Sequence, residues 1–155
     1  MDARDQPNRP PELVIADLVI AVETSDDVIA ALHELAAAEL EFLFAAREHD
    51  AGDVVLVARN GGEPVGYIAA TDAADGRTMV WEHLVVPDFR NRGVGRALLG
   101  QLAGRLAAPA VMVIDPIGTL DPERVADYYK ACGFEIDPAS GQMRGIAGAI
   151  AAAAS

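Results

Sequence analysis

The chain alternates between two kinds of hydrophobic spacing, and each kind predicts one type of element. Short runs rich in apolar and β-branched residues, bounded by turn residues, predict strands. These runs are Leu13 to Val22, Val54 to Arg59, Pro64 to Thr71, Thr78 to Val86 and Ala110 to Asp115. Helical spacing of apolar positions occurs in Ser25 to His49, Gly93 to Ala107 and the segment that starts at Asp121. The first helical segment breaks near Ala38 to Glu41, so the predicted order is βααβββαβα, an α/β (α+β) arrangement.

Both ends of the chain differ from its middle. Residues 1–11 are polar and rich in proline, which predicts a flexible arm. Residues 146–155 are mostly alanine and are predicted to be a small-residue C-terminal tail. The stretch between them, residues 12–145, is long enough for one domain with its own hydrophobic core.

Composition excludes several classes of protein. The net charge is −12, from 12 basic and 24 acidic residues, and nucleic-acid recognition relies on clustered Lys and Arg, so no nucleic acid is expected as a partner. Cys132 is the single cysteine, which argues against an internal disulfide framework and against a cysteine-based zinc site; no metal is predicted. No secretory signal or membrane-spanning stretch is evident, and a cytoplasmic location with no membrane partner is expected.

Basic residues gather at one point of this acidic chain, where a predicted strand meets a predicted helix. Arg90, Arg92 and Arg96 lie within seven residues, around a helix that begins on Gly93-Val94-Gly95. Glycine lets a bulky anion come close to the backbone. The first N–H groups of a helix point outward, and the macrodipole adds about half a positive charge there. The segment therefore predicts a site for a phosphorylated ligand.

Two common phosphate-binding loops fit this segment poorly. A Walker A loop requires Gly-Lys followed by Ser or Thr, whereas Gly95 is followed here by Arg96 and Ala97. A dinucleotide fingerprint requires a third glycine where this chain has Leu98, and it belongs near the first strand. A nucleotide-binding protein that uses this loop stays an alternative.

Two motifs together resemble one enzyme superfamily. The pattern Arg90-x-x-Gly93-x-Gly95 after Leu84-Val85-Val86-Pro87 is similar to the acetyl-CoA pyrophosphate loop of the GNAT N-acetyltransferases. About thirty residues later, Tyr128-Tyr129-x-x-x-Gly133-Phe134 resembles the second signature of that superfamily. Two departures stand near it: Asp121 and Pro122 replace an asparagine frequent in the family, and Lys130-Ala131 replaces an acid-lysine pair. The first departure puts some coenzyme contacts in doubt.

The resemblance implies a fold and a set of coenzyme contacts. The fold is a mixed, mostly antiparallel central sheet flanked by helices, with one or two strands after Phe134. The donor cosubstrate is acetyl-CoA. Main-chain groups of the strand before the loop bind its pantetheine arm, and the N–H of Val85 polarises the thioester carbonyl, a contribution typically of about 3 kcal/mol. The residues expected to contact the coenzyme are Leu84, Val85, Val86, Arg90, Asn91, Arg92, Gly93, Val94, Gly95 and Arg96.

The same resemblance suggests catalytic groups. Attack requires a neutral amine, and an amine with a pKa of about 10 must first lose a proton. Glu82 is the first candidate for the proton acceptor, with His83, water or a distant residue as alternatives; in a regular strand His83 points to the opposite face, and a bulge can reverse that parity. Tyr129 occupies the general-acid position, whereas Tyr128 is expected in the core. Cys132 is expected to be buried and unreactive.

The predicted function is transfer of an acetyl group from acetyl-CoA to a primary amine by direct attack in a ternary complex. The alternative is a catalytically silent acyl-CoA-binding sensor or assembly module of the same fold. The acceptor is a small-molecule amine or a peptide. Glu34, Glu39, Glu41 and Glu48 would suit a cationic acceptor, although a solvated helix face is the simpler explanation of them. A homodimer stays open.

Overall fold

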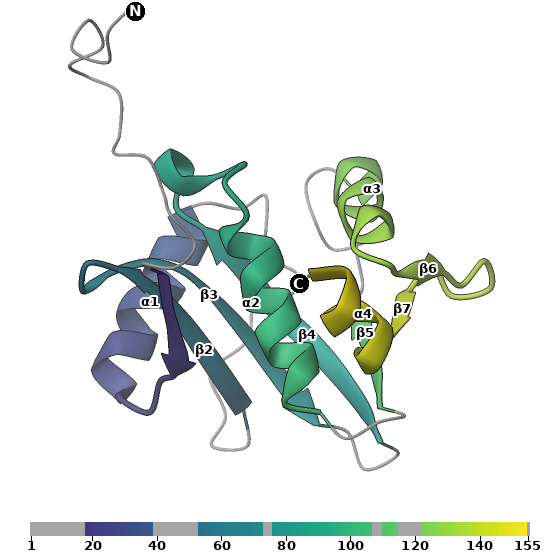
Figure 1. Cartoon of the computed structure of the whole chain (residues 1–155), viewed down its shortest axis with the longest axis horizontal. Coiled ribbons are helices and arrows are strands. Elements are labelled where there is room, and N and C mark those ends of the chain that lie inside the picture. Colours follow the sequence, from purple (N-terminus) through teal and green to yellow (C-terminus); the bar gives the residue numbers. More distant parts are fainter. Residues whose placement is uncertain (1–17, 39–52, 73–75, 107–109, 115–121, 155) are drawn as a thin grey trace, which may run out of the picture.

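The computed structural model describes residues 18–38, 53–72, 76–106, 110–114 and 122–154. Twelve elements lie in these ranges and are shown in Figure 1. They are β1 (Leu18–Val22), α1 (Asp26–Ala38), β2 (Asp53–Asn60), β3 (Glu63–Asp72), β4 (Arg77–Val85), the 3-10 helix η4 (Pro87–Phe89), α2 (Val94–Gly104), β5 (Val111–Ile114), α3 (Pro122–Ala131), β6 (Glu135–Ile136), β7 (Met143–Ile146) and α4 (Ala147–Ala154).

One mixed sheet runs through the molecule. Its strand order is β1-β2-β3-β4-β5-β7-β6, and every neighbouring pair is antiparallel except β4 and β5. This arrangement confirms the predicted fold class, including the strands expected after Phe134. Among the described residues, β4 and β5 pair only where Arg77 to Met79 face Val111 to Val113. Within the described ranges, this pairing covers the first three residues of β4.

Helices cover both faces of this sheet, so two hydrophobic cores form. Alternate residues of β2 point to opposite sides, as the two-residue period of a strand requires. Val55 and Val57 join Ile29 and Leu32 of α1 in the smaller core. Leu56 and Ala58 join the larger core, to which α2, α3 and α4 contribute Leu98, Leu99, Leu102, Val125, Tyr129, Ala147 and Ile150. Both faces of the central strands are buried in this way.

The C-terminal segment differs from the predicted tail. Residues 147–154 form helix α4, which packs beside α2 (Figure 1). Alanine has the highest helix propensity, and Ile150 anchors the helix with a side chain that is only 1% exposed. A Cβ on Gly145 would lie 2.8 Å from the tip of Ile150, so the glycine leaves the space that this side chain fills.

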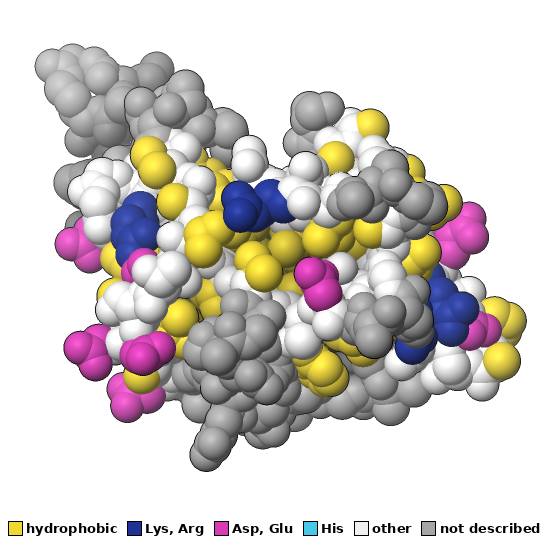
Figure 2. Space-filling model, turned by 90° about the horizontal axis from the view of Figure 1, so that it is seen from below, with side chains coloured by type: hydrophobic (Ala, Val, Ile, Leu, Met, Phe, Trp, Pro, Cys, Tyr) yellow, Lys and Arg dark blue, Asp and Glu magenta, His cyan; other side chains and the backbone are white. Residues whose placement is uncertain are grey.

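Several predicted features lie outside the described residues. These are the N-terminal arm, the start of the first predicted strand, and the second half of the Ser25 to His49 segment, including Glu39, Glu41 and Glu48. None of the helices in the described ranges is long and apolar enough to cross a bilayer. Seen from below, the described side chains form an apolar middle with most acidic groups toward the two sides (Figure 2).

Candidate functional site

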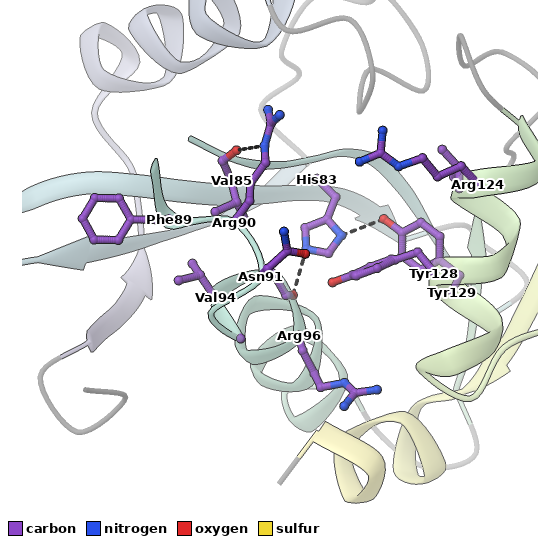
Figure 3. Close-up of a pocket in the computed structure, with 13 residues that line it drawn as sticks. His83, Val85, Phe89, Arg90, Asn91, Val94, Arg96, Arg124, Tyr128 and Tyr129 are labelled. Atoms are coloured by element: carbon purple, nitrogen blue, oxygen red, sulfur yellow. Dashed lines mark hydrogen bonds between the residues drawn. The ribbon is translucent and has the colours of Figure 1, made fainter. Parts of the chain in front are cut away.

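A cavity of about 340 Å³ lies where β4, α2 and α3 meet (Figure 3). It is lined by His83, Val85, Phe89, Arg90, Asn91, Gly93, Val94, Gly95, Arg96, Arg124, Val125, Tyr128 and Tyr129. Ligand pockets typically enclose about 300–1,000 Å³ and combine apolar walls with a few polar groups. Both sequence motifs therefore contribute to one cavity, the glycine-rich loop from one side and the tyrosine pair from the other.

The loop between β4 and α2 is shaped by two left-handed residues. Asn91 has a φ of 61°, and Gly93, the N-cap of α2, has a φ of 89°. Asn tolerates this region better than most residues, and Gly occupies it without steric penalty. None of the described side chains caps α2, and the first N–H groups of a helix have no partner within it. These N–H groups and the helix dipole make the start of α2 suitable for a phosphate.

The four arginines near the loop have different environments. The Nε of Arg90 donates to the carbonyl of Val85 at 2.9 Å, and Arg96 donates to the carbonyl of Ala131 in α3 at 2.9 Å. Arg92 lies over the ring of Phe89, with the guanidinium carbon 5.7 Å from the ring centroid, and does not line the cavity. Arg124, in the first turns of α3, does line it. Sequence reasoning missed Arg124 because it stands apart from the glycine-rich motif.

Leu84, Val85 and Val86, at the end of β4, were predicted to contact the coenzyme, and of these three Val85 lines the cavity. The N–H of Val86 donates to the carbonyl of Val65 in β3 at 2.9 Å. Because bonded and non-bonded pairs alternate in an antiparallel ladder, the polar backbone groups of Val85 point away from β3. The bond from Arg90 to the Val85 carbonyl agrees with this direction. Leu84 and Val86 do not line the cavity, and Leu84 belongs to the smaller core on the α1 side.

His83 connects the two motifs inside the cavity. Its Nδ1 lies 2.6 Å from the hydroxyl of Tyr129, and its Nε2 lies 2.9 Å from the carbonyl oxygen of Gly95 (Figure 3). The side chains of His83 and Tyr129 are 3% and 1% exposed. Burial lowers the pKa of His83 to about 4, against a smaller opposing effect of the bond to Gly95. The imidazole is therefore neutral at physiological pH.

The two tyrosines of α3 have different environments. Tyr129 is buried in the larger core, and burial raises its pKa well above 10.0. Tyr128 was expected in the core, and that expectation is wrong: its side chain is 37% exposed and lines the cavity. The buried side of α3 carries Val125, Ala126 and Tyr129, which leaves Tyr128 at the edge of that side. A Cβ on Gly95 would lie 2.8 Å from its hydroxyl, so Gly95 allows α2 and α3 to approach.

Glu82 lies on the other side of the sheet. A β-bulge at this point pairs Ala69 with Glu82 and Ala70 with Val80, so that Trp81 is the extra residue. Val80 points into the larger core, and the bulge turns Glu82 toward the α1 side, opposite to His83. There the Tyr67 hydroxyl donates to Oε2 of Glu82 at 2.7 Å, and both side chains are buried. Glu82 does not line the cavity.

Comparison with known proteins identifies the family. The model of the acetyltransferase (GNAT) domain matches residues 51–136, which is more than half of the chain. The chain belongs to the GNAT acetyltransferase family. Within this family, the uncharacterized N-acetyltransferase ycf52 of Gracilaria tenuistipitata var. liui is 30% identical over 74 residues, which are 48% of this chain and 39% of that protein. The GNAT chain thus spans well under half the length of this curated relative.

Solved structures of low sequence identity share the fold of this GNAT domain. The N-acetyl transferase YhhK of E. coli, bound to coenzyme A, superposes with a TM-score of 0.64 at 18% identity, covering 83% of this chain and 98% of that one. Naa50 of Arabidopsis thaliana, in complex with the bisubstrate analogue CoA-Ac-MVNAL, gives a TM-score of 0.59 at 20% identity over 78% and 85% of the two chains. Within the described residues, no group of three or more His, Cys, Asp or Glu side chains could hold a metal ion.

Proposed function

We propose that this GNAT domain transfers an acetyl group from acetyl-CoA to a primary amine by direct attack in a ternary complex. One observation carries the proposal. The uncapped start of α2 and the buried His83–Tyr129 pair lie in one cavity, beside the C-terminal half of β4. A phosphate-binding end and a hydrogen-bonding end in one cavity fit a ligand that carries a pyrophosphate at some distance from its reactive sulfur.

The roles proposed for the chain's own residues follow from these positions. The first turn of α2 binds the pyrophosphate through N–H groups, with Arg90, Arg92, Arg96 or Arg124 adding charge-assisted contacts. The acetyl thioester supplies the activated acyl group. The N–H of Val85 points away from β3 and is the group proposed to polarise the thioester carbonyl. Tyr129 is proposed to stabilise the departing thiolate, and it lines the cavity.

Glu82 is the proposed acceptor of the amine proton. Its position on the α1 side places it opposite the cavity, so the amine and the coenzyme would approach the sheet from different faces. Names of relatives support an amine as acceptor. A curated relative is serotonin N-acetyltransferase 2 of Oryza sativa, and another similar fold is an aminoglycoside 6'-acetyltransferase. The Naa50 complex holds a peptide-like analogue, so the amine can belong to a small molecule or to a peptide N-terminus.

Two measurements test this function. In a thermal-shift titration, CoA and acetyl-CoA should raise the melting temperature, whereas ATP and NAD should leave it unchanged. Release of free thiol from acetyl-CoA is then followed with a panel of amines: spermidine, serotonin, an aminoglycoside and a peptide with a free N-terminus. Thiol release that depends on an amine supports the proposal. Binding of CoA without thiol release across the panel would favour the silent acyl-CoA-binding module, and stabilisation by ATP alone would overturn both.

A further inference from the structure

The buried imidazole of His83 holds two groups in place. One ring nitrogen faces the Gly95 carbonyl in the first turn of α2, and the other faces the Tyr129 hydroxyl of α3. His83 therefore joins the loop proposed for the pyrophosphate to the tyrosine proposed to act at the sulfur. His83 itself belongs to β4, so its side chain connects β4 with α2 and α3. The sequence motif alone assigns no such role to this position.

The partners of His83 determine where its proton lies. A backbone carbonyl can only accept a hydrogen bond, so Nε2 must carry the ring proton toward Gly95. A neutral imidazole has one ring proton, and Nδ1 therefore offers a lone pair. The hydroxyl of Tyr129 must then donate its single proton to Nδ1. With that proton engaged, the phenol oxygen has only lone pairs left for other groups in the cavity.

This arrangement limits what Tyr129 can do before the acetyl group has moved. A thioester sulfur is neutral and a weak acceptor, whereas a thiolate is charged, and hydrogen bonds to charged groups are roughly twice as strong. We propose that His83 is a positioning residue: it holds the Tyr129 hydroxyl until the CoA thiolate forms, and the hydroxyl then turns to donate to the sulfur. This inference rests on the function proposed above. It adds which atom donates and which atom accepts in each hydrogen bond of His83.

The acid strengths of the groups agree with a hydrogen bond rather than a proton transfer. A thiol has a pKa of about 8.5, and burial raises the pKa of Tyr129 well above 10.0. Tyr129 therefore keeps its proton in the presence of the thiolate. Neutral His83 has no proton on Nδ1 to give, so it serves as an acceptor. Both residues return to their starting state when CoA leaves.

The hydrogen bond between His83 and Tyr129 can be followed directly by ¹⁵N NMR of histidine-labelled protein. Spectra are recorded for the free protein and for its complexes with CoA and with desulfo-CoA, at a pH of about 9, above the usual thiol pKa. His83→Gln assigns the resonance among the three histidines, and Tyr129→Phe gives the Nδ1 position without the bond. The free protein and the desulfo-CoA complex should show the hydrogen-bonded position, and the CoA complex should move to that of Tyr129→Phe.

A double-mutant cycle on turnover gives the second test, using acetyl-CoA and the amine of the panel that releases most thiol. Without His83 the Tyr129 hydroxyl is no longer held in position for the sulfur, so His83→Leu should lower kcat on the order of tenfold, the value of one hydrogen bond to a charged group. The KM for acetyl-CoA should stay within about twofold. His83→Gln, which can both accept and donate, should recover most of that loss. In Tyr129→Phe, adding His83→Leu should change kcat little further. A merely structural role predicts independent losses that multiply.

The outcomes separate this inference from the proposed function. Binding of CoA with identical Nδ1 positions in the CoA and desulfo-CoA complexes overturns the inference and leaves the proposed function standing. Independent losses in the cycle overturn it as well. Failure of CoA to bind at all overturns the proposed function, and the spectrum of the free protein still decides whether Tyr129 donates to His83. An unshifted Nδ1 resonance in Tyr129→Phe would show that it does not.

Discussion

Gly93→Val tests the assignment of the glycine-rich loop. Gly93 caps α2 with a φ of 89°, a region in which a β-branched residue is a genuine outlier. Left-handed backbone costs about 1–2 kcal/mol for an ordinary L-residue, so unfolding should become easier by at least that amount. For a chain of 155 residues this lowers the melting temperature by roughly 2–8 °C. If the loop instead changes its conformation to relieve the strain, the first N–H groups of α2 change position. Each hydrogen bond to a charged phosphate that is lost in this way costs about 1.5–3 kcal/mol of binding free energy.

The matched control is Gly62→Val, in the turn between β2 and β3. Gly62 has a φ of 90°, almost the same as Gly93, and a Cβ there would meet nothing within 4 Å. Both variants should therefore lose similar stability in thermal unfolding. Isothermal titration with CoA should give wild-type affinity for Gly62→Val and at least a tenfold loss for Gly93→Val, since about 1.4 kcal/mol corresponds to tenfold. Equal CoA affinity in the two variants would refute the loop assignment.

Three further predictions concern the stability of the fold. Tyr67→Phe removes the donor to the buried carboxylate of Glu82 and should lower the free energy of unfolding by about 2 kcal/mol in urea titrations; no measurable loss would contradict this bond. Ile150→Ala should cost about 2–5 kcal/mol if α4 is part of the core, whereas a free tail would show almost no change. Between pH 6.5 and 4 the unfolded chain binds a proton that folded His83, with a pKa of about 4, does not, so stability falls as the pH falls. Wild type should lose roughly 3 kcal/mol more than His83→Gln over this window, measured by urea unfolding at each pH.

Much of the fold follows from local signals in the sequence. The turn at Asn60 to Gly62, the apolar runs beside it and the glycine-rich helix start each define their elements without long-range information. The C-terminal helix was not predicted, because alanine and glycine give no amphipathic stripe and Ile150 is one of few anchors. Its formation depends on the space over Gly145, which is a tertiary property.

The candidate site was predicted less completely, because its geometry depends on how strands and helices meet. Sequence spacing places Glu82 and His83 on opposite faces, but only the bulge at Trp81 decides which face each one takes. Tyr128 was assigned to the core, but sequence alone does not give the rotation of α3 about its axis. Its exposure follows from the rotation of α3 against the start of α2, where Gly95 leaves room for the hydroxyl.

The bulge in β4 has a chemical consequence that combines these positions. Neighbouring residues of a strand point to opposite faces, and the bulge decides that His83 takes the cavity side and Glu82 the α1 side. A proton that leaves the amine toward Glu82 and a sulfur that leaves toward Tyr129 would then depart on opposite faces of the sheet. The roles proposed for Glu82 and Tyr129 therefore fall on opposite faces of β4, and the bulge at Trp81 is the feature that separates them.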